Sequence, residues 1–209
     1  MVQLLLALVV VAVLVWLGWA LASRWRSLPC PSWLGWMVEM ENPLARNARS
    51  AVIVQKLGLQ PGMKVLDAGC GPGRVTVPVA KAVGAGGSVV ALDLQAGMLE
   101  RAEEKVRQEG LTNVRFVQAG LGEGQLPSEE FDRALLVTVL GEIPNREAAL
   151  REIREALKPG GVLSVTETVF DPHYLRREAL AREAEAAGFV GKAVYGGKMA
   201  YTAHFEKVG

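Results

Sequence analysis

An α/β fold built on a parallel sheet is the fold class that the sequence predicts, and two observations predict it. From Lys64 onwards, short and continuously apolar runs alternate with amphipathic stretches that have helical spacing. A strand that is buried on both faces has such a continuous run, whereas a strand with one wet face alternates apolar and polar residues. Strands that alternate with helices are typical of a parallel sheet covered on both faces.

The individual elements follow from these runs and from the turn residues between them. We expect strands at Lys64–Asp67, Ser88–Asp93, Val114–Gln118, Phe131–Val137 and Gly161–Thr166. Helices are expected at about Ala45–Leu57, Val75–Val83, Ala96–Glu109, Arg146–Leu157 and Tyr174–Ala187. The last stretch differs, because Val190–Tyr195 and Ala200–Glu206 flank a Gly-Gly pair and so predict an antiparallel hairpin at one edge of the sheet.

Composition excludes several classes of function. The chain has 23 Lys and Arg residues against 22 Asp and Glu residues, so it lacks the excess positive charge that drives nucleic-acid binding. Cys30 and Cys70 are the only cysteines, and His173 and His204 the only histidines. These are too few for a disulfide framework or for a metal centre rich in Cys or His. We therefore expect no nucleic-acid partner and no metal.

Hydrophobicity is concentrated at the amino terminus. The stretch from Leu4 to Ala22 contains no charged residue, and as a helix it would span about 28 Å, close to the hydrocarbon thickness of a bilayer. A cleaved signal peptide is the main alternative, but no Lys or Arg precedes the run. We expect residues 1–28 to form a single-pass transmembrane anchor. Arg24 and Arg26 follow the span and predict that the rest of the chain is cytoplasmic.

All five tryptophans lie before residue 37. Trp33, Trp36, Met40 and Leu44 recur at helical spacing, which suits a short amphipathic helix at the level of the lipid headgroups, where indole rings prefer to lie. The alternative is a helix packed on the globular domain. We expect an interfacial segment at 29–44 and a catalytic domain at 45–209.

The chemistry centres on the loop after the first predicted strand. Gly69, Gly71 and Gly73 follow that strand at a spacing of two, and Asp93 ends the next strand, where an acid can bind ribose hydroxyls. A dinucleotide site prefers a Gly-x-Gly-x-x-Gly pattern, and a carboxylate such as Asp67 would repel a pyrophosphate but attract a cationic amino-acid ligand. The loop therefore favours S-adenosylmethionine over NAD.

The stretches LDAGCGPGRVT (66–76), VVALDLQAGML (89–99), FDRALLVTVLGEIP (131–144) and LREIREALKPGGVLSVTE (150–167) carry a resemblance to a known family. Residues from about 45 to 207 resemble class I S-adenosylmethionine-dependent methyltransferases, most closely the small-molecule branch that includes ubiquinone and menaquinone biosynthesis enzymes. The resemblance implies a Rossmann-like seven-stranded sheet with the order 3-2-1-4-5-7-6 and S-adenosyl-L-methionine as the cofactor.

The resemblance also implies which residues bind this cofactor. Asp67 and the three glycines would line its methionine end, with Cys70 filling space inside the loop. Asp93 would bind the ribose, Leu94 and Met98 would pack near the adenine, and Val137 and Thr138 would close the floor of the site. The family's usual acid after the third strand is missing here, which leaves the backbone of Gly120 or Leu121, or the Glu123 side chain, to meet the adenine edge.

Methyl transfer from a sulfonium depends mainly on positioning and desolvation, but an acceptor that must lose a proton also needs a base. The candidates are Glu142 after the fourth strand and His173 and Tyr174 after the fifth, all expected at the carboxyl edge of the sheet. We expect a membrane-anchored methyltransferase that acts on a small lipophilic acceptor such as a phospholipid amine, a quinone or a hydrophobic thiol. The alternatives are a tethered methyltransferase of a soluble metabolite and a non-catalytic cofactor-binding module.

Overall fold

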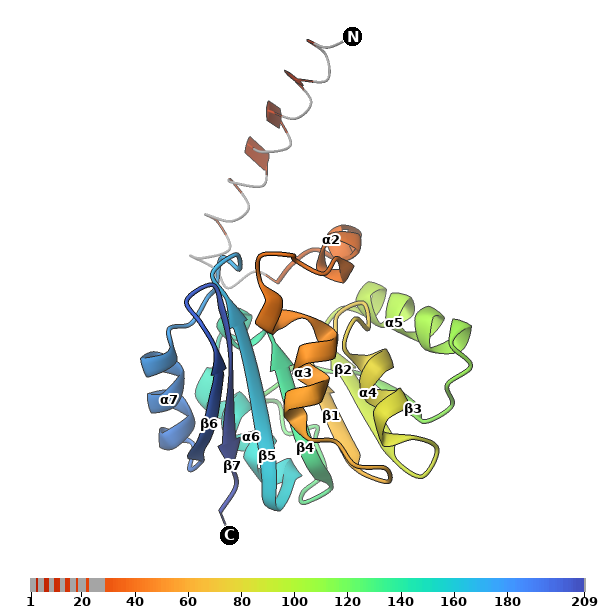
Figure 1. The fold of residues 1–209 in the computed structure, drawn as a ribbon, viewed down its shortest axis with the longest axis vertical. Coiled ribbons are helices and arrows are strands. Elements are labelled where there is room, and N and C mark those ends of the chain that lie inside the picture. Colours follow the sequence, from red (N-terminus) through yellow and green to blue (C-terminus); the bar gives the residue numbers. More distant parts are fainter. Residues whose placement is uncertain are drawn as a thin grey trace.

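A seven-stranded sheet with the order β3-β2-β1-β4-β5-β7-β6 forms the centre of the molecule (Figure 1). The computed structural model describes residues 29–208 together with Gln3, Leu6, Ala7, Val10, Val11, Leu14, Val15, Gly18 and Ala22. The strands are β1 (Lys64–Ala68), β2 (Ser88–Asp93), β3 (Val114–Gln118), β4 (Phe131–Val137), β5 (Leu157–Thr168), β6 (Val190–Gly196) and β7 (Ala200–Glu206). Strand β7 is antiparallel to both β5 and β6, and the strands β1 to β5 are parallel. The predicted sheet order and the predicted hairpin are confirmed.

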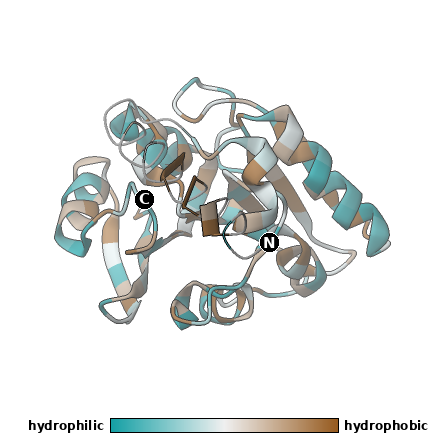
Figure 2. Cartoon of the chain, turned by 90° about the horizontal axis from the view of Figure 1, so that it is seen from above, coloured by the Kyte–Doolittle hydropathy of each residue, from teal (hydrophilic) through white to brown (hydrophobic). Residues whose placement is uncertain are grey.

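Helices cover both faces of this sheet. The helices are α2 (Gly35–Glu39), α3 (Ser50–Leu57), α4 (Thr76–Val83), α5 (Ala96–Gln108), α6 (Arg146–Ala156) and α7 (Arg177–Ala186), with short 3-10 turns η1 (Ser32–Leu34), η2 (Arg46–Ala48) and η3 (Leu140–Glu142). Figure 1 shows that α2 lies beyond the end of the sheet where the parallel strands finish, on the side opposite to the carboxyl terminus. Figure 2 looks down on this end, with the largely hydrophilic outer side of α5 at the right.

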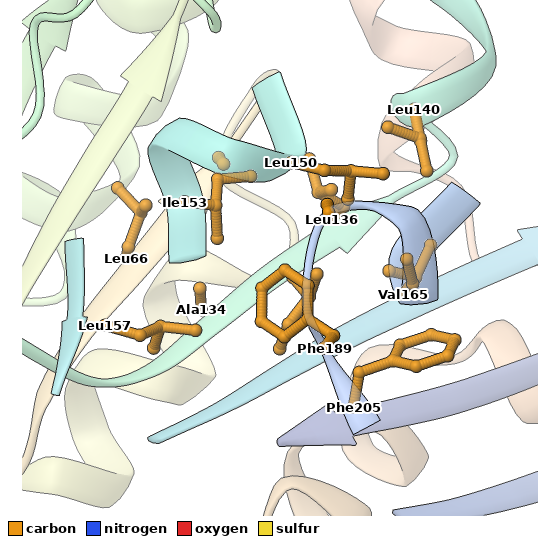
Figure 3. Close-up of a cluster of buried hydrophobic side chains, with 14 of the residues drawn as sticks. Leu66, Ala134, Leu136, Leu140, Leu150, Ile153, Leu157, Val165, Phe189 and Phe205 are labelled. Carbon is orange, nitrogen blue, oxygen red and sulfur yellow. The ribbon is translucent and has the colours of Figure 1, made fainter. Parts of the chain in front are cut away.

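Alternate residues of the strands fill two separate apolar layers, as expected for a sheet buried on both faces. On one face Leu66, Ala134 and Leu163 pack with Leu150 and Ile153 of α6, and Figure 3 shows part of this cluster. On the other face, strand residues pack against α3 and α4; that cluster comprises Ile53, Leu57, Val65, Val75, Val79, Ala80, Val83, Val89 and Leu135. The two layers hold the carboxyl ends of β1, β2 and β4 side by side, which is where the site forms.

Helix α7 begins later than the sequence predicts, at Arg177 instead of Tyr174. The backbone N–H of Tyr174 donates to the carbonyl of Asp171, and the N–H of Leu175 donates to the Glu167 carboxylate of β5. These donors attach the loop to the strand, so the loop continues for one more turn before the helix starts. Strand β5 is longer than predicted, because the Lys-Pro-Gly-Gly stretch before Gly161 extends it back to Leu157, which pairs with Phe131.

The predicted helix at Ala45–Leu57 is divided in two. Arg49 is extended, with φ −71° and ψ 140°, and it separates η2 from α3. The Glu41 carboxylate accepts hydrogen bonds from both the backbone N–H and the hydroxyl of Ser50, so it satisfies donors at the first turn of α3. The helix predicted from Trp33 to Leu44 is likewise short, because Met40 is extended at its end.

The predicted transmembrane anchor lies largely outside the described residues. Those of its residues that the structure does describe are helical, and Leu6, Val10, Val11, Leu14 and Val15 are each more than half exposed. Within the described part of the chain, no helix combines the length and the apolar character needed to cross a membrane.

Candidate active site

The glycine loop turns the chain from β1 into α4 beneath the end of β2. The backbone N–H groups of Gly69 and Cys70 both donate to the carbonyl of Leu92, at 2.7 and 2.9 Å. Gly69 has φ +72°, and a Cβ added there would lie 2.5 Å from the Val139 side chain. A Cβ at Gly73 would press on Ala102 of α5. These two glycines therefore allow close packing between elements, whereas Gly71, with φ +52°, faces open space.

Asp93 holds the glycine loop in place and presents a carboxylate at its edge. One carboxylate oxygen accepts from the N–H of Gly71 and the other from the N–H of Gln95, both at 2.9 Å. Each oxygen keeps further acceptor capacity, because a carboxylate has about four lone-pair sites. Burial raises the pKa of the Asp93 carboxyl. The side chain is thus rigid and suited to accept hydrogen bonds from a pair of hydroxyls.

Asp67 at the end of β1 is a second buried carboxylate. Its Oδ2 accepts a 2.6 Å hydrogen bond from the hydroxyl of Thr76, the first residue of α4. Burial, with a contribution from nearby Asp93, raises the pKa of Asp67 to about 6. Two carboxylates whose negative charge is made costly by burial would be stabilised by a cationic ligand.

A cavity of about 360 Å³ opens beside this loop, within the size range of small-molecule sites. Most of the predicted cofactor-binding residues line it, and Gly73 is the exception, since it supports the loop from behind. The lining residues from that prediction are Asp67, Gly69, Cys70, Gly71, Asp93, Leu94, Met98, Gly120, Leu121, Val137 and Thr138. The structure therefore brings together residues that are scattered over four strand ends in the sequence.

The floor of the cavity carries a strained turn that sequence reasoning did not identify. Thr138 follows β4 and has φ +55°, a left-handed conformation that is uncommon for a residue other than glycine. Its N–H donates to the carbonyl of Thr166 and its hydroxyl donates to the carbonyl of Val137. Backbone strain of this kind concentrates at ligand sites, and here it turns the chain so that Val139 packs against Gly69.

The residues predicted to lie near the adenine are at the end of β2 and in the loop after β3. Met98 is buried, whereas Leu94 is 58% exposed at the cavity mouth. The Glu123 carboxylate folds back over Gly120, so a Cβ at that glycine would clash with it. Glu123 lines the cavity.

The opposite side of the cavity holds an acid–imidazole group. Glu142 and Asp171 line the cavity, and the buried Nδ1 of His173 lies 3.7 Å from the Glu142 Oε1 and 3.6 Å from the Asp171 Oδ1. Burial and then the charge of Asp171 raise the pKa of Glu142 to about 8, although His173 opposes the shift. A carboxyl group with a pKa near neutrality is suited to accept a proton from a substrate.

The other two predicted candidates for the base lie behind Glu142 and not at the cavity surface. His173 packs its backbone against Gly141, where a Cβ would clash with the His173 carbonyl. Tyr174 contacts the Tyr201 ring edge-on at 6.1 Å and packs against the apolar cluster around α6 and α7. We assign His173 to positioning Glu142, and we place Tyr174 in the support of the β5–α7 loop.

Sequence reasoning missed a segment before the predicted domain that lines the cavity. We call Pro29 and Cys30 the Pro29–Cys30 strap. Pro29, Cys30 and Val38 line the cavity, although they precede the domain that the sequence predicts. The Gln95 side chain donates a 2.8 Å hydrogen bond to the carbonyl of Cys30, and the backbone of Cys30 forms a hydrogen bond with Glu142. At Pro29 and Cys30 the chain thus lies against the side of the cavity that holds Glu142. No sequence signal marked these residues, because their roles depend on backbone groups.

The residues present fit S-adenosylmethionine. Gly71 leaves space where a ligand can approach the main chain, Asp93 offers acceptors for ribose hydroxyls, and Asp67 and Glu142 add negative charge around a site for a sulfonium cation. Burial raises the pKa of the Cys70 thiol well above its usual range, so this residue fills space and is not a nucleophile.

Comparison with known proteins supports this assignment. Residues 65–161 match the family model described as a methyltransferase domain. The ubiquinone/menaquinone biosynthesis C-methyltransferase UbiE of Shewanella pealeana is 35% identical over 126 residues, which are 60% of this chain and 50% of that protein. The chain therefore spans about half the length of this curated relative.

Solved structures share the fold. A SAM dependent methyltransferase from Aquifex aeolicus has a TM-score of 0.77 at 24% identity, covering 86% of this chain and 100% of that chain. The 1,6-didemethyltoxoflavin-N1-methyltransferase of Burkholderia thailandensis, solved with S-adenosylhomocysteine, has a TM-score of 0.64 at 24% identity, covering 81% and 80% of the two chains. In its sheet order, its glycine loop and the match of residues 65–161 to the methyltransferase-domain model, the chain is similar to class I S-adenosylmethionine-dependent methyltransferases. Within that class the chain resembles the C-methyltransferases of ubiquinone and menaquinone biosynthesis.

Glu167 of β5 provides a test of the electrostatics behind the site. It is 1% exposed, its Oε1 has no hydrogen-bond partner among the described residues, and burial raises its pKa to about 8. Its contribution to stability is therefore complete below the usual pKa of 4.5 and is lost as the pH rises towards 8, at up to about 1.4 kcal/mol per pH unit. We expect Glu167→Gln to remove this loss.

The measurement is the midpoint of thermal unfolding at pH values of about 5 and about 8. The Glu167→Gln variant should gain stability over the wild type mainly at the higher pH, whereas Glu155→Gln, at an exposed position on α6, should gain none at either. An equal difference at both pH values would show that Glu167 is not a buried titrating group.

Proposed function

We propose that this protein is a membrane-anchored S-adenosylmethionine-dependent methyltransferase that acts on a small lipophilic acceptor, with its catalytic domain on the cytoplasmic side. The observation that carries the proposal is the Pro29–Cys30 strap, which joins the apolar amino-terminal segment to the wall of the cavity beside Glu142. An acceptor that partitions into the bilayer would enter at the point where the chain itself leaves it. The basic residues Arg24 and Arg26 after the apolar run support the cytoplasmic orientation.

The acceptor class follows from the cavity and from the relatives. Cys30, Ile143 and Pro144 give the Glu142 side of the cavity an apolar lining beside the carboxyl groups of Glu142 and Asp171. UbiE carries the name of a C-methyltransferase of quinone biosynthesis, and a quinol ring would combine the apolar body and the acidic proton that this lining suits. Phospholipid amines and hydrophobic thiols share the lipophilic body and stand as further acceptors.

The residues divide the work of the reaction between binding and proton removal. The cofactor supplies an electrophilic methyl group on sulfur when bound. Asp93 and the glycine loop fix its ribose and amino-acid ends, and the strap excludes water from the reacting groups. The Glu142 carboxylate would accept the proton that the acceptor loses when it takes the methyl group supplied by the bound cofactor. His173 and Asp171 hold that carboxylate in position.

A panel of acceptors tests the proposal on the full chain reconstituted in lipid nanodiscs. Methyl-labelled cofactor is supplied with a long-chain demethylated quinol, phosphatidylethanolamine or an alkanethiol, and with a short-chain, water-soluble analogue of each. We expect label in the organic extract and released S-adenosylhomocysteine with a long-chain acceptor. Label on the soluble analogues alone would indicate a tethered enzyme of a soluble metabolite. Cofactor binding without release over the whole panel would indicate a non-catalytic module.

A further inference from the structure

A second surface, separate from the predicted anchor, gathers exposed apolar side chains at the end of the molecule where the parallel strands finish. They come from three separate segments: η1 with α2 and the loop after it, the β5–α7 loop, and the β6–β7 turn, all on that side of the sheet (Figure 1). We call this set the apolar rim: Trp33, Trp36, Met40, Leu44, Val169, Phe170 and Met199. Trp33 is 64% exposed and Leu44 is 67% exposed. Exposed apolar side chains gathered at one end of a molecule are typical of a surface that binds a partner or a membrane.

The rim is built on backbone contacts that hold the segments together. The N–H of Val169 donates to the carbonyl of Met199 at 3.1 Å, and the Thr168 hydroxyl donates to the same carbonyl. Arg177 donates to the carbonyl of Gly197, which holds the β6–β7 turn against the start of α7. The exposed Met199 side chain therefore stands on a fixed turn beside the β5–α7 loop.

A basic groove lies within the rim. Pro43, Leu44, Arg46 and Asn47 form one wall, and residues 197–200 form the other, including Lys198 and Met199. Neither Arg46 nor Lys198 forms an ion pair with a carboxylate in the part of the chain that the structure describes. By contrast, two carboxylates of this region already form ion pairs: Glu39 with Lys105, and Glu41 with Arg74. The groove thus combines two available cations with apolar side chains.

This combination fits one kind of partner. An anionic bilayer surface presents phosphate groups at the depth where indole and aliphatic side chains insert, and each basic residue near it adds to the attraction. Val38 and Asp171, which line the cavity, lie on the same segments as rim residues. A soluble protein partner would not explain this arrangement, whereas a bilayer that holds a lipophilic acceptor would. Pro29 and Cys30, which follow the apolar run from Leu4 to Ala22 in the sequence, line the cavity itself.

We propose that the apolar rim and the basic groove dock the catalytic domain flat on an anionic bilayer surface, with Arg46 and Lys198 receiving lipid phosphates. This inference rests on the proposed function. Docking of the rim and the groove would place the cavity mouth against the lipid that supplies the acceptor. The anchor restricts the domain to the membrane, and the docking face sets its orientation.

The test is amide hydrogen exchange of the full chain in nanodiscs, read in peptides covering 42–48 and 195–201. Because the anchor would be present in every sample, nanodiscs of phosphatidylglycerol and of phosphatidylcholine compare docking alone. We expect exchange to be slower by about fivefold or more in the anionic nanodiscs. A double variant, Arg46→Glu with Lys198→Glu, should lose this protection. The matched double variant Arg115→Glu with Arg182→Glu makes the same change of charge at exposed positions on β3 and α7 and should retain it.

If amide exchange in the wild-type chain were equal in the two lipids, the docking face would be overturned, whatever the variants show. Retained protection in the Arg46→Glu, Lys198→Glu chain would overturn the basic groove as its centre. Neither readout depends on methyl transfer. Protection in the anionic nanodiscs, together with no methyl transfer to any acceptor of the panel, would therefore count against the proposed function alone.

Discussion

Replacing Asp93 by Ala is expected to weaken S-adenosylmethionine binding by at least about a hundredfold, because two hydrogen bonds to a charged group contribute about 1.5 to 3 kcal/mol each. The variant also loses the acceptor for the N–H of Gly71, which loosens the glycine loop. Asp93→Asn keeps one carbonyl oxygen, so its affinity for the cofactor should lie between those of the wild type and of Asp93→Ala. Isothermal titration with the cofactor measures all three dissociation constants.

The matched control is Asp132→Asn, at the opposite end of the sheet near the start of β4. Asp132 binds Lys158 and the N–H of Lys64, so its loss can lower stability, but it lies away from the cavity. Its affinity for the cofactor should equal that of the wild type. If Asp93→Ala bound the cofactor as tightly as Asp132→Asn, the ribose assignment would be wrong.

Replacing Glu142 by Gln is expected to reduce kcat by about 10² to 10⁴ while cofactor affinity changes little, because a positioned general base contributes on this scale. The pKa of Glu142 is raised to about 8, so the proton-accepting carboxylate is the minor form at lower pH. For the wild type, kcat/KM should therefore rise with pH and level off above about 8. The Gln variant should lack this dependence.

The measurement is S-adenosylhomocysteine release across this pH range, with the acceptor that turns over best. Glu155→Gln, exposed on α6, serves as the control and should keep the wild-type profile. A Glu142→Gln enzyme with an unchanged kcat and the same pH dependence would remove Glu142 from the reaction. His173→Gln should shift the profile and lower kcat less, because His173 acts on Glu142 and does not line the cavity.

The sheet could be predicted almost completely from the sequence, because its strands are buried on both faces and so have continuous apolar runs. The predicted bounds of β2, β3, β4 and β7 agree with those in the structure. The differences arise where side-chain contacts hold the chain, because such contacts leave no periodic pattern in the sequence. The Glu167 carboxylate accepts from the N–H of Leu175, and α7 begins only after this loop. The Glu41 carboxylate accepts from the N–H of Ser50 at the start of α3, after the extended Arg49.

The gathering of the predicted cofactor-binding residues around one cavity could also be predicted, since glycine spacing and strand-end acids are local signals. On the opposite side, Glu142 was predicted, but the contribution of Pro29 and Cys30 was not. The approach of the Pro29–Cys30 strap to Glu142 and Gln95 depends on backbone hydrogen bonds between segments far apart in sequence. The positive φ of Thr138 similarly reflects the packing of Val139 on Gly69 and has no signature in the residue type. Of the two interpretations of residues 29–44, packing on the globular domain is seen at Gly35, which lies against Met98 and Arg101. Trp33 and Trp36 are exposed, and the interfacial position of the segment stays a prediction.

A crystal structure of the full chain with S-adenosylhomocysteine tests the central claim most directly. The account predicts that the ribose hydroxyls bind the Asp93 carboxylate, that the adenine lies between Met98 and the Gly120–Glu123 loop, and that the sulfur faces the compartment lined by Cys30, Glu142 and Ile143. The product bound in the reverse direction, with its adenine beside Glu142, or bound outside this cavity, would contradict it.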